Sequence, residues 1–309
     1  MDLNFGAATE RRRGLAGGVE WPTLCLAGVI YGLWTAATFF HDRLPWPLLG
    51  LVGGWIIAWQ GSLQHEIIHG HPTRSRRLNT LIGFAPLSLW LPFEVYRQSH
   101  LAHHATEHLT DPLYDPEARY LPAAAPLARR WAAALQATLL GRLVLGPFIE
   151  IGVFCLEEVG RIIRREPGRL RLWAWHGLAA ALIVGWLVLM CHMSLWLYLG
   201  CFVYPGAALS LLRSYAEHRA DPTPQHRVAV VERAPILGLL FLNNNLHAAH
   251  HDQPGVSWRH LPTLYARDRE RLLCANGGLV YDGYGEIVRR FLLKPHDHPI
   301  YPSTGGVAP

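Results

Sequence analysis

The sequence predicts an all-α integral membrane protein with four transmembrane helices in two hairpins, interfacial helices and a histidine-rich cap on the cytoplasmic side. Three observations predict this class. Half of the 309 residues are apolar and only 17% are charged, a balance too hydrophobic for an ordinary soluble domain. Four apolar segments are long enough to cross a bilayer, which takes about 20 residues. Three clusters of histidines lie just outside those segments.

The four candidate spans occur as two pairs with short connections. The connections are residues 41–45 and 192–194, so each pair predicts a helical hairpin. The spans are Trp21–Phe40, Trp46–Leu63, Leu172–Cys191 and Leu195–Leu212.

The distribution of basic residues predicts the orientation of these spans. Of the 28 lysines and arginines, only Arg43 falls in the two short connections. By the positive-inside rule, the opposite side is the cytoplasm, with both chain termini inside. All three histidine clusters fall on that same side, although the orientation was assigned without them. The boundaries expected are a cytoplasmic segment at 1–20, a membrane domain at 21–265 and a cytoplasmic segment at 266–309.

Two further apolar stretches are expected to lie at the membrane surface. Leu78–Tyr96 is interrupted by Pro86 and Pro92 and must return to the side it left, which favours an interfacial or re-entrant helix. Trp131–Val159 carries charged residues among its apolar ones and predicts an amphipathic helix. From Pro295 onward the chain is rich in proline and glycine, and regular structure is not expected there.

Composition also argues against other classes of protein. The net charge is +5, but the arginines flank apolar segments and do not form a patch interleaved with aromatic residues, so nucleic-acid binding is not expected. The five cysteines are scattered without a CxxC pair, which favours free thiols over a disulfide framework or a zinc site.

The first histidine cluster reads HEIIHGH over residues 65–71. His65 and His69 lie one helical turn apart and can face the same way. With Glu66 they also match the HExxH signature of zinc proteases, in which two histidines hold zinc and the glutamate acts as base. His71 lies off this helical face and is a candidate either as a ligand or as a hydrogen-bond partner of one.

The second cluster, HLAHH, places His100, His103 and His104 on one helical face. Such a triplet has few structural uses other than metal binding. Asp111, which follows shortly after, could orient a ligating imidazole through its free ring nitrogen, but a turn formed by Asp-Pro explains it equally well.

The third cluster, HAAHH, repeats this spacing with His247, His250 and His251. A second HxxHH has no role in a zinc protease, which needs a single ion, two histidines and one further ligand. His218 follows the fourth span on the side where the clusters converge and is a candidate ninth ligand. Its neighbour Glu217 is expected either to partner a ligand or to form an ion pair with Arg219.

Eight or more imidazoles on one membrane face exceed what a single ion can use. Imidazole suits iron, copper, zinc and nickel. The residues alone therefore predict a site for two metal ions at a membrane surface.

The chain resembles the membrane fatty acid desaturase and hydroxylase superfamily, whose signature is three histidine boxes, HxxxH, HxxHH and HxxHH, around two pairs of membrane helices. Here the boxes are HEIIH, HLAHH and HAAHH, and the resemblance covers about residues 20–265. The flanks, 110–112 after the second box and 258–262 after the third, are similar to those of bacterial members, which implies a bacterial inner membrane. The additional histidine, His218, also fits the family's pattern.

The resemblance implies a centre of two non-haem iron ions that activates dioxygen and abstracts hydrogen from an unactivated C–H bond. The eight box histidines and His218 would be its ligands. In some relatives an asparagine one turn before the additional histidine binds iron through water. This chain has Ser214 there, and Asn243 is a candidate substitute.

The expected function is therefore an O2-dependent fatty acyl (lipid) desaturase. The chain has no haem signature, ferredoxin-type cysteines or dinucleotide fingerprint, so an external electron donor such as a ferredoxin, rubredoxin or cytochrome-type protein is expected. The same boxes serve lipid hydroxylases and carotenoid ketolases or hydroxylases, which stay open as alternatives. An intramembrane HExxH zinc protease is the alternative from another class. A metal-transport protein is disfavoured because the spans are nearly free of charge.

Overall fold

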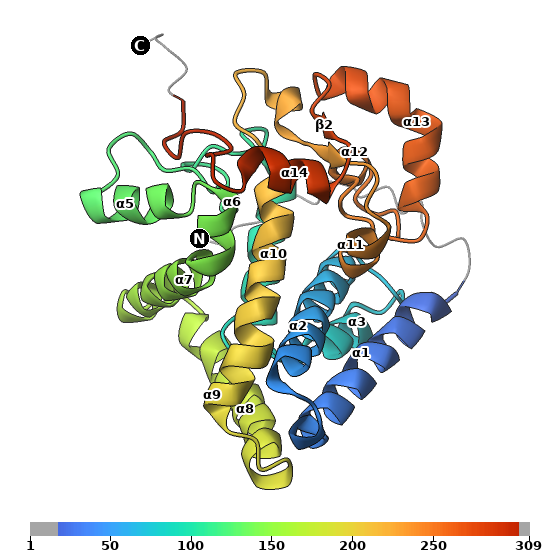
Figure 1. Ribbon diagram of the computed structural model, residues 1–309, viewed down its shortest axis with the longest axis vertical. Helices are drawn as coiled ribbons and strands as arrows, with labels where there is room; N and C mark the ends of the chain where they lie inside the picture. Colours follow the sequence, from blue (N-terminus) through green and yellow to red (C-terminus); the bar gives the residue numbers. More distant parts are fainter. Residues whose placement is uncertain (1–17, 303–309) are drawn as a thin grey trace.

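The computed structural model describes residues 18–302, and this part of the chain is mostly helical (Figure 1). The expectations for the N-terminal arginines and for the last seven residues lie outside the described residues. Within the described range, the strands β1 (Val230–Val231) and β2 (Val280–Tyr281) form one short parallel pair. The helices are α1 (Trp21–Phe39), α2 (Trp46–Ile68), α3 (Arg76–Gly83), α4 (Phe93–Ala105), α5 (Leu127–Leu135), α6 (Leu139–Val144), α7 (Gly146–Ile163), α8 (Arg169–Gly185), α9 (Leu195–Tyr198), α10 (Tyr204–Glu217), α11 (Pro235–Leu240), α12 (His247–Asp252), α13 (Leu261–Ala275) and α14 (Tyr284–Phe291).

Three stretches are long and apolar enough to cross a membrane: Trp21–Phe39, Arg169–Met190 and Leu195–Glu217. The second joins α8 to a π-helical turn, and the third joins α9 and α10 through another. They match three of the four segments expected from the sequence. The fourth, α2, is a continuous helix of 23 residues, but its last turns carry buried polar side chains such as Gln60 and Gln64.

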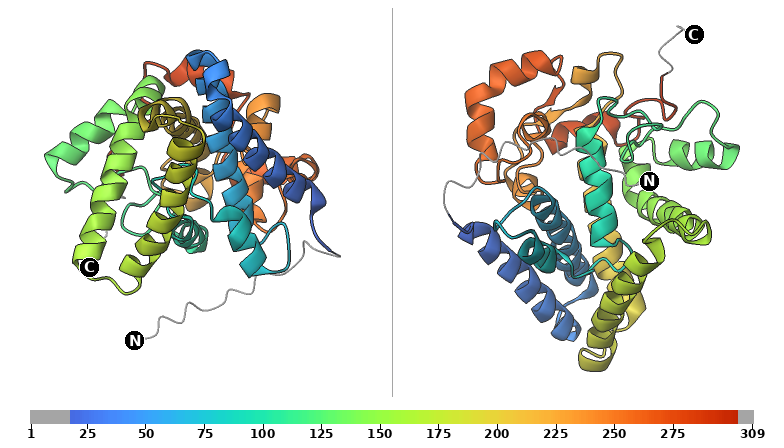
Figure 2. Two further views of the ribbon diagram at one scale, coloured as in Figure 1. Left: turned by 90° about the horizontal axis from the view of Figure 1, so that it is seen from below. Right: turned by 180° about the vertical axis from the view of Figure 1, so that it is seen from behind.

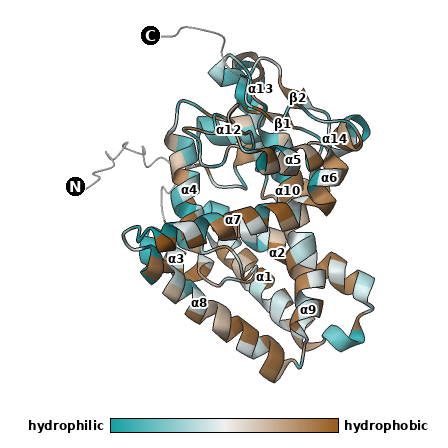
Figure 3. Cartoon of the chain, turned by 90° about the vertical axis from the view of Figure 1, so that its left-hand side faces the viewer, coloured by the Kyte–Doolittle hydropathy of each residue, from teal (hydrophilic) through white to brown (hydrophobic). Residues whose placement is uncertain are grey.

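The apolar helices lie together at one end of the molecule, and the polar segments gather at the other (Figure 3). α1 and α2 are joined by residues 40–45 and pack against each other (Figure 2). α10 and the π-helical turn before it pack along α2, so α2 lies at the centre of the bundle.

Glycines allow the close approach of α2 and α10. A Cβ atom on Gly54 would lie 2.7 Å from the Pro205 Cβ, and one on Gly206 would lie 2.5 Å from the Ile57 Cβ. Only hydrogen fits in these positions without moving a helix. This contact sets how closely the first half of α2 and the start of α10 approach each other.

The two stretches expected to be single interfacial helices are each divided. In Leu78–Tyr96 the helix α3 ends at Gly83, and α4 begins at Phe93, directly after Pro92. The intervening residues form turns because proline cannot continue a helix. The second histidine cluster therefore lies on α4, a helix separate from α3.

The stretch Trp131–Val159 was expected to be one amphipathic helix, and this is wrong. It contains α5, α6 and α7. The Thr138 side chain accepts a hydrogen bond from the Gly141 amide (3.1 Å) and starts α6, while Pro147 lies in the first turn of α7. A side-chain cap and an N-terminal proline both favour new helix starts.

Beyond α10, the chain forms a polar cap over one end of the helices. β1, β2 and helices α11 to α14 build it around two small apolar cores (Figure 1). Residues 295–301, which we name the C-terminal strap, contain no helix or strand, as expected from the sequence. The strap is nevertheless held by backbone hydrogen bonds with Leu121, from the Leu121 amide to Pro299 (2.9 Å) and from the Tyr301 amide to Leu121 (2.9 Å).

Candidate metal centre

The structure brings all nine histidines singled out in the sequence into one place, where they divide into two groups. Within each group, one nitrogen of every imidazole lies within 4.8 Å of the others. The five-histidine group comprises His65, His69, His100, His104 and His250. The four-histidine group comprises His103, His218, His247 and His251.

The two HxxHH clusters divide their histidines between the groups in a reciprocal way. In α4, the first and last histidines join the five-histidine group and His103 joins the other. In α12, the first and last join the four-histidine group and His250 joins the other. Residues at i and i+4 share a face, whereas i+3 is rotated from it, so one short helix can serve two neighbouring centres. The groups meet where His104 stacks on His251, with ring centroids 4.3 Å apart.

The distances between imidazole nitrogens match those between ligands of one metal ion. In the five-histidine group, the Nε2 atoms of His69 and His100 are 3.0 Å apart, and those of His104 and His250 are 3.1 Å apart. In the four-histidine group, the Nε2 atoms of His218 and His247 are 2.9 Å apart. Two nitrogens bound at right angles, each about 2.1 Å from one ion, are separated by about 3.0 Å.

Hydrogen bonds among the imidazoles cannot account for this arrangement. A neutral imidazole has one N–H, so a cage of rings with their Nε2 atoms facing inward cannot satisfy all of them. His65 Nε2 is buried and has no hydrogen-bond partner among residues 18–302. A buried nitrogen without a partner is costly unless something absent from the protein chain binds it. The residues present therefore fit a pair of metal ions.

The outer ring nitrogens donate hydrogen bonds away from the groups. His103 Nδ1 donates to Asp115 (2.8 Å), and His100 Nδ1 donates to Glu117 (3.2 Å). His218 Nδ1 donates to the Arg227 carbonyl (3.2 Å). A proton held on Nδ1 leaves Nε2 free, which is the usual arrangement for a metal-binding histidine.

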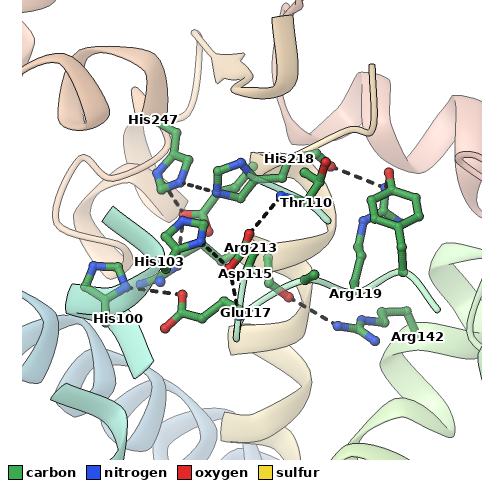
Figure 4. A pocket seen from close by; sticks show the side chains of 14 residues that line it. His100, His103, Thr110, Asp115, Glu117, Arg119, Arg142, Arg213, His218 and His247 are labelled. Atoms are coloured by element: carbon green, nitrogen blue, oxygen red, sulfur yellow. Dashed lines mark hydrogen bonds and ion pairs between the residues drawn. The ribbon is translucent and has the colours of Figure 1, made fainter. Parts of the chain in front are cut away.

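Glu217 completes the set of carboxylates around the four-histidine group. It lies 3.5 Å from His247 Nδ1 and accepts a hydrogen bond from Asn244 (2.7 Å). Its ion pair is with Arg213 (3.0 Å), one turn earlier on α10, and not with Arg219 as the sequence suggested. Figure 4 shows Arg213 among the histidines and carboxylates.

Local electrostatics favour a neutral His104 and a charged Glu117. Burial, followed by the charges of His100 and His103, lowers the pKa of His104 to about 2. Burial would raise the pKa of Glu117, but the charge and hydrogen bond of His100 outweigh it and hold this pKa at about 2. His103 differs from His104: burial lowers its pKa, but the hydrogen bond to Asp115 and the charge of Glu117 raise it overall.

Three other residues singled out in the sequence lie outside the two groups. His71 forms an ion pair with Glu20 (3.2 Å). Asn243 donates to the Trp258 carbonyl (2.9 Å) from a left-handed backbone conformation. Asp111 accepts a hydrogen bond from the Leu113 amide (3.0 Å), as expected for a turn, so Asp115 and not Asp111 holds an imidazole.

Sequence reasoning missed Asp115, Glu117 and Arg213 as parts of this site. Asp115 and Glu117 follow the second cluster in a proline-rich turn, DPLYDPE. The sequence pattern does not indicate which of its three acidic residues contacts a histidine. Arg213 directly follows the expected fourth span, which ends at Leu212. Its position four residues before Glu217 was the available signal.

Comparison with known proteins agrees with these findings. The sequence model of the fatty acid desaturase family matches residues 43–285. That range contains all nine grouped histidines and Asp115, Glu117 and Glu217. A search of curated proteins found no match. The matched range is most of the chain and includes all three histidine boxes, so the protein belongs to the fatty acid desaturase family, within the membrane desaturase and hydroxylase superfamily.

Proposed function

We propose that this protein is a membrane-bound oxidase with two non-haem iron ions, and that it is an O2-dependent fatty acyl (lipid) desaturase. The observation that carries the proposal is the division of nine imidazoles into two groups with the nitrogen spacing of metal ligands. Membership of the desaturase family favours iron over the other metals that imidazole suits.

Each group would hold one ion through its Nε2 atoms. Five neutral ligands in one group and four in the other leave coordination positions open, and such a pair supplies dioxygen activation when bound. The protein's own part is to fix the imidazoles. Asp115 and Glu117 hold the Nδ1 protons of His103 and His100, which keeps the Nε2 atoms unprotonated and correctly directed.

Four spans in two hairpins fit this function best, with α2 as the fourth span. α8 exposes Leu170, Leu178 and Leu182, each more than half exposed, and an apolar face of this size is stable in lipid and not in water. The ends of α2 and α10 that carry His65, His69 and His218 lie together. By the distribution of arginines, we assign this end to the cytoplasmic side of a bacterial inner membrane, with residues 21–265 as the membrane domain.

The partners proposed are a lipid or acyl substrate, dioxygen and an external electron donor. An acyl chain in the bilayer would reach a centre at the membrane surface without entering water. Desaturation draws two electrons from the substrate and two from the donor for each dioxygen reduced to water, which requires a ferredoxin, rubredoxin or cytochrome-type donor.

Lipid analysis after expression in a host with defined fatty acids tests the proposal. Desaturation predicts a new double bond in the wild type and none in a His247→Ala variant of equal abundance. An oxygenated lipid or carotenoid, absent from that variant, would instead identify a hydroxylase or ketolase on the same metal centre. No change in any lipid or carotenoid under conditions of iron and donor supply would contradict the proposal.

The zinc protease alternative has less support from the geometry. Glu66 accepts a hydrogen bond from the Trp258 amide (3.0 Å) and is buried, whereas a protease base must reach a water on the ion. His65 and His69 also share their group with three further histidines. This alternative predicts one zinc ion per chain and no dependence of metal binding on His247.

A further inference from the structure

A polar cavity borders the four-histidine group near the end of α10. Its volume is about 100 Å³, and Figure 4 shows the residues around it. His103, His218 and His247, three of the four imidazoles of this group, line the cavity, and so does His100 of the five-histidine group. A polar cavity needs only about 10–15 Å³ for each water molecule. This cavity therefore has room for several waters in contact with the group.

The lining is unsuited to an acyl chain. Arg119, Arg142 and Arg213 face Asp115, Glu117 and Glu217 across the cavity. Thr110 has a buried hydroxyl without a hydrogen-bond partner in the described part of the chain. Placing hydrocarbon against such groups leaves them unsolvated, which costs several kcal/mol, whereas water satisfies them.

A second hollow of about 20 Å³ lies next to this cavity. The two share Arg119, Tyr120 and Arg142 as lining residues. Ala137, which precedes α6, and Asp297 of the C-terminal strap form part of the outer hollow.

The C-terminal strap covers this outer hollow through polar contacts. Asp297 forms an ion pair with Arg119 (2.6 Å) and accepts a hydrogen bond from the Tyr120 hydroxyl. The His296 amide donates to the Ala137 carbonyl (3.2 Å). The strap is thus held mainly by polar groups that water could replace.

We propose that these two connected hollows are the hydrophilic entrance of the metal centre, through which water and protons exchange with the four-histidine group beneath the C-terminal strap. This inference rests on the proposed function, because the proposed reaction consumes protons at the metal centre. Desaturation and hydroxylation both consume two protons from water for each dioxygen, beyond the hydrogens taken from the substrate. The requirement is therefore the same whichever of the two reactions the protein catalyses.

Cysteine accessibility tests the passage without any metal. Ser214 lines the inner cavity, and serine is close to cysteine in size. The Ser214→Cys protein is treated with 2-aminoethyl methanethiosulfonate, and labelling of Cys at this position is followed by peptide mass spectrometry, which separates it from the native thiols. We expect labelling in the folded protein. Labelling only after denaturation overturns the proposal.

Three further substitutions in the Ser214→Cys background, one of them a control, locate the route. Ala137→Phe fills the outer hollow and is expected to slow labelling about tenfold, because reagent must then wait for local opening. Ala134→Phe, on the exposed side of α5 nearby, is the matched control and is expected to leave the rate unchanged. Asp297→Asn loosens the strap and is expected to accelerate labelling. Equal labelling rates in all these variants overturn the proposed route.

Azide binding to the oxidised, iron-loaded protein separates this inference from the proposed function. Azide is a small hydrophilic ligand whose binding to iron gives a visible absorption band. If azide binds most slowly to the Ala137→Phe protein and fastest to the Asp297→Asn protein, the order matches that of thiol labelling. This result supports the passage as the route to the metal. Iron present with azide kinetics insensitive to both variants overturns the passage and leaves the function standing. Absence of iron contradicts the function, while the thiol labelling still decides the passage.

Discussion

The five-histidine and four-histidine groups share the same chemistry but lie in different surroundings. In the five-histidine group, a carboxylate contacts one imidazole, His100, and His65 Nε2 and His69 Nδ1 are buried without hydrogen-bond partners among the described residues. In the four-histidine group, His103 and His247 face carboxylates and His218 donates to a carbonyl. A polar cavity borders three imidazoles of this group but only His100 of the five-histidine group.

For the proposed pair of metal ions, this difference predicts two unequal positions. Carboxylate partners raise the basicity of an imidazole and fix its orientation, so the four-histidine position depends strongly on residues outside its ligand set. The five-histidine position depends more on the number of its ligands. The following changes test this contrast.

Removal of a ligand has the largest expected effect. His247→Ala leaves three imidazoles in its group, and His250→Ala leaves four in the other. We expect both to lose activity completely and His247→Ala to lose more metal, measured as iron per chain after purification. His108→Ala, four residues beyond His104 and exposed, is the control. Equal metal loss in His108→Ala and the two ligand variants would contradict the assignment.

Removal of an outer partner is expected to have the next largest effect. Asp115→Asn removes the charge that holds the His103 ring and should cost about 10–100-fold in metal affinity or activity. Asp111→Asn is the matched control, because it makes the same chemical change at a carboxylate that contacts the Leu113 amide. Little change in metal affinity or activity is expected for this variant. Titration of the apo protein with Fe²⁺ compares the two. Similar affinities in both variants would show that Asp115 does not support the centre.

Packing between α2 and α10 holds the two groups together, since α2 carries His65 and His69 while α10 leads to His218. Gly54→Ala places a methyl group 2.7 Å from Pro205 and should destabilise the protein by about 1–3 kcal/mol. Gly61→Ala, on the same helix with nothing within 4 Å of the added carbon, should be neutral or stabilising. Denaturant unfolding in detergent measures both. A Gly54→Ala protein as stable as Gly61→Ala would contradict the close contact.

A substitution in the C-terminal strap, which lies over the four-histidine side, has the smallest expected effect. Burial would raise the pKa of Asp297, but its hydrogen bond with His296 and the charge of Arg119 lower it overall. A carboxyl whose pKa is depressed on folding stabilises the protein above its unfolded pKa, and this contribution is lost as the pH falls through the folded value. Asp297→Asn should therefore lower the unfolding temperature at pH 7, by a loss of about 1–3 kcal/mol.

The difference between wild type and Asp297→Asn should shrink as the pH falls below about 4. Unfolding temperatures at a series of pH values provide the measurement. A difference that stays constant down to pH 3 would show that the ionised carboxylate does not hold the strap.

The sequence predicted the ligand candidates better than their surroundings. The nine histidines could be found because helical spacing places them on common faces and because all lie at one end of apolar helices. To predict their division into two groups, one would need the packing angle between α4 and α12, and no sequence pattern encodes that angle. That they bind metal stays a prediction.

The outer partners could not be found from spacing. Asp115 and Asp111 occupy similar turns, and only tertiary structure distinguishes the one that meets His103. The helices of 127–163 were mistaken for one because amphipathic periodicity continues across the breaks at Thr138 and Pro147. The apolar spans, in contrast, followed directly from length and composition, and three of the four were found as such.

Metal analysis of the purified full-length protein tests the central claim most directly. The account predicts about two irons per chain, falling in His247→Ala and His250→Ala but not in His108→Ala. A single stoichiometric zinc ion, unaffected by loss of His247, would contradict it.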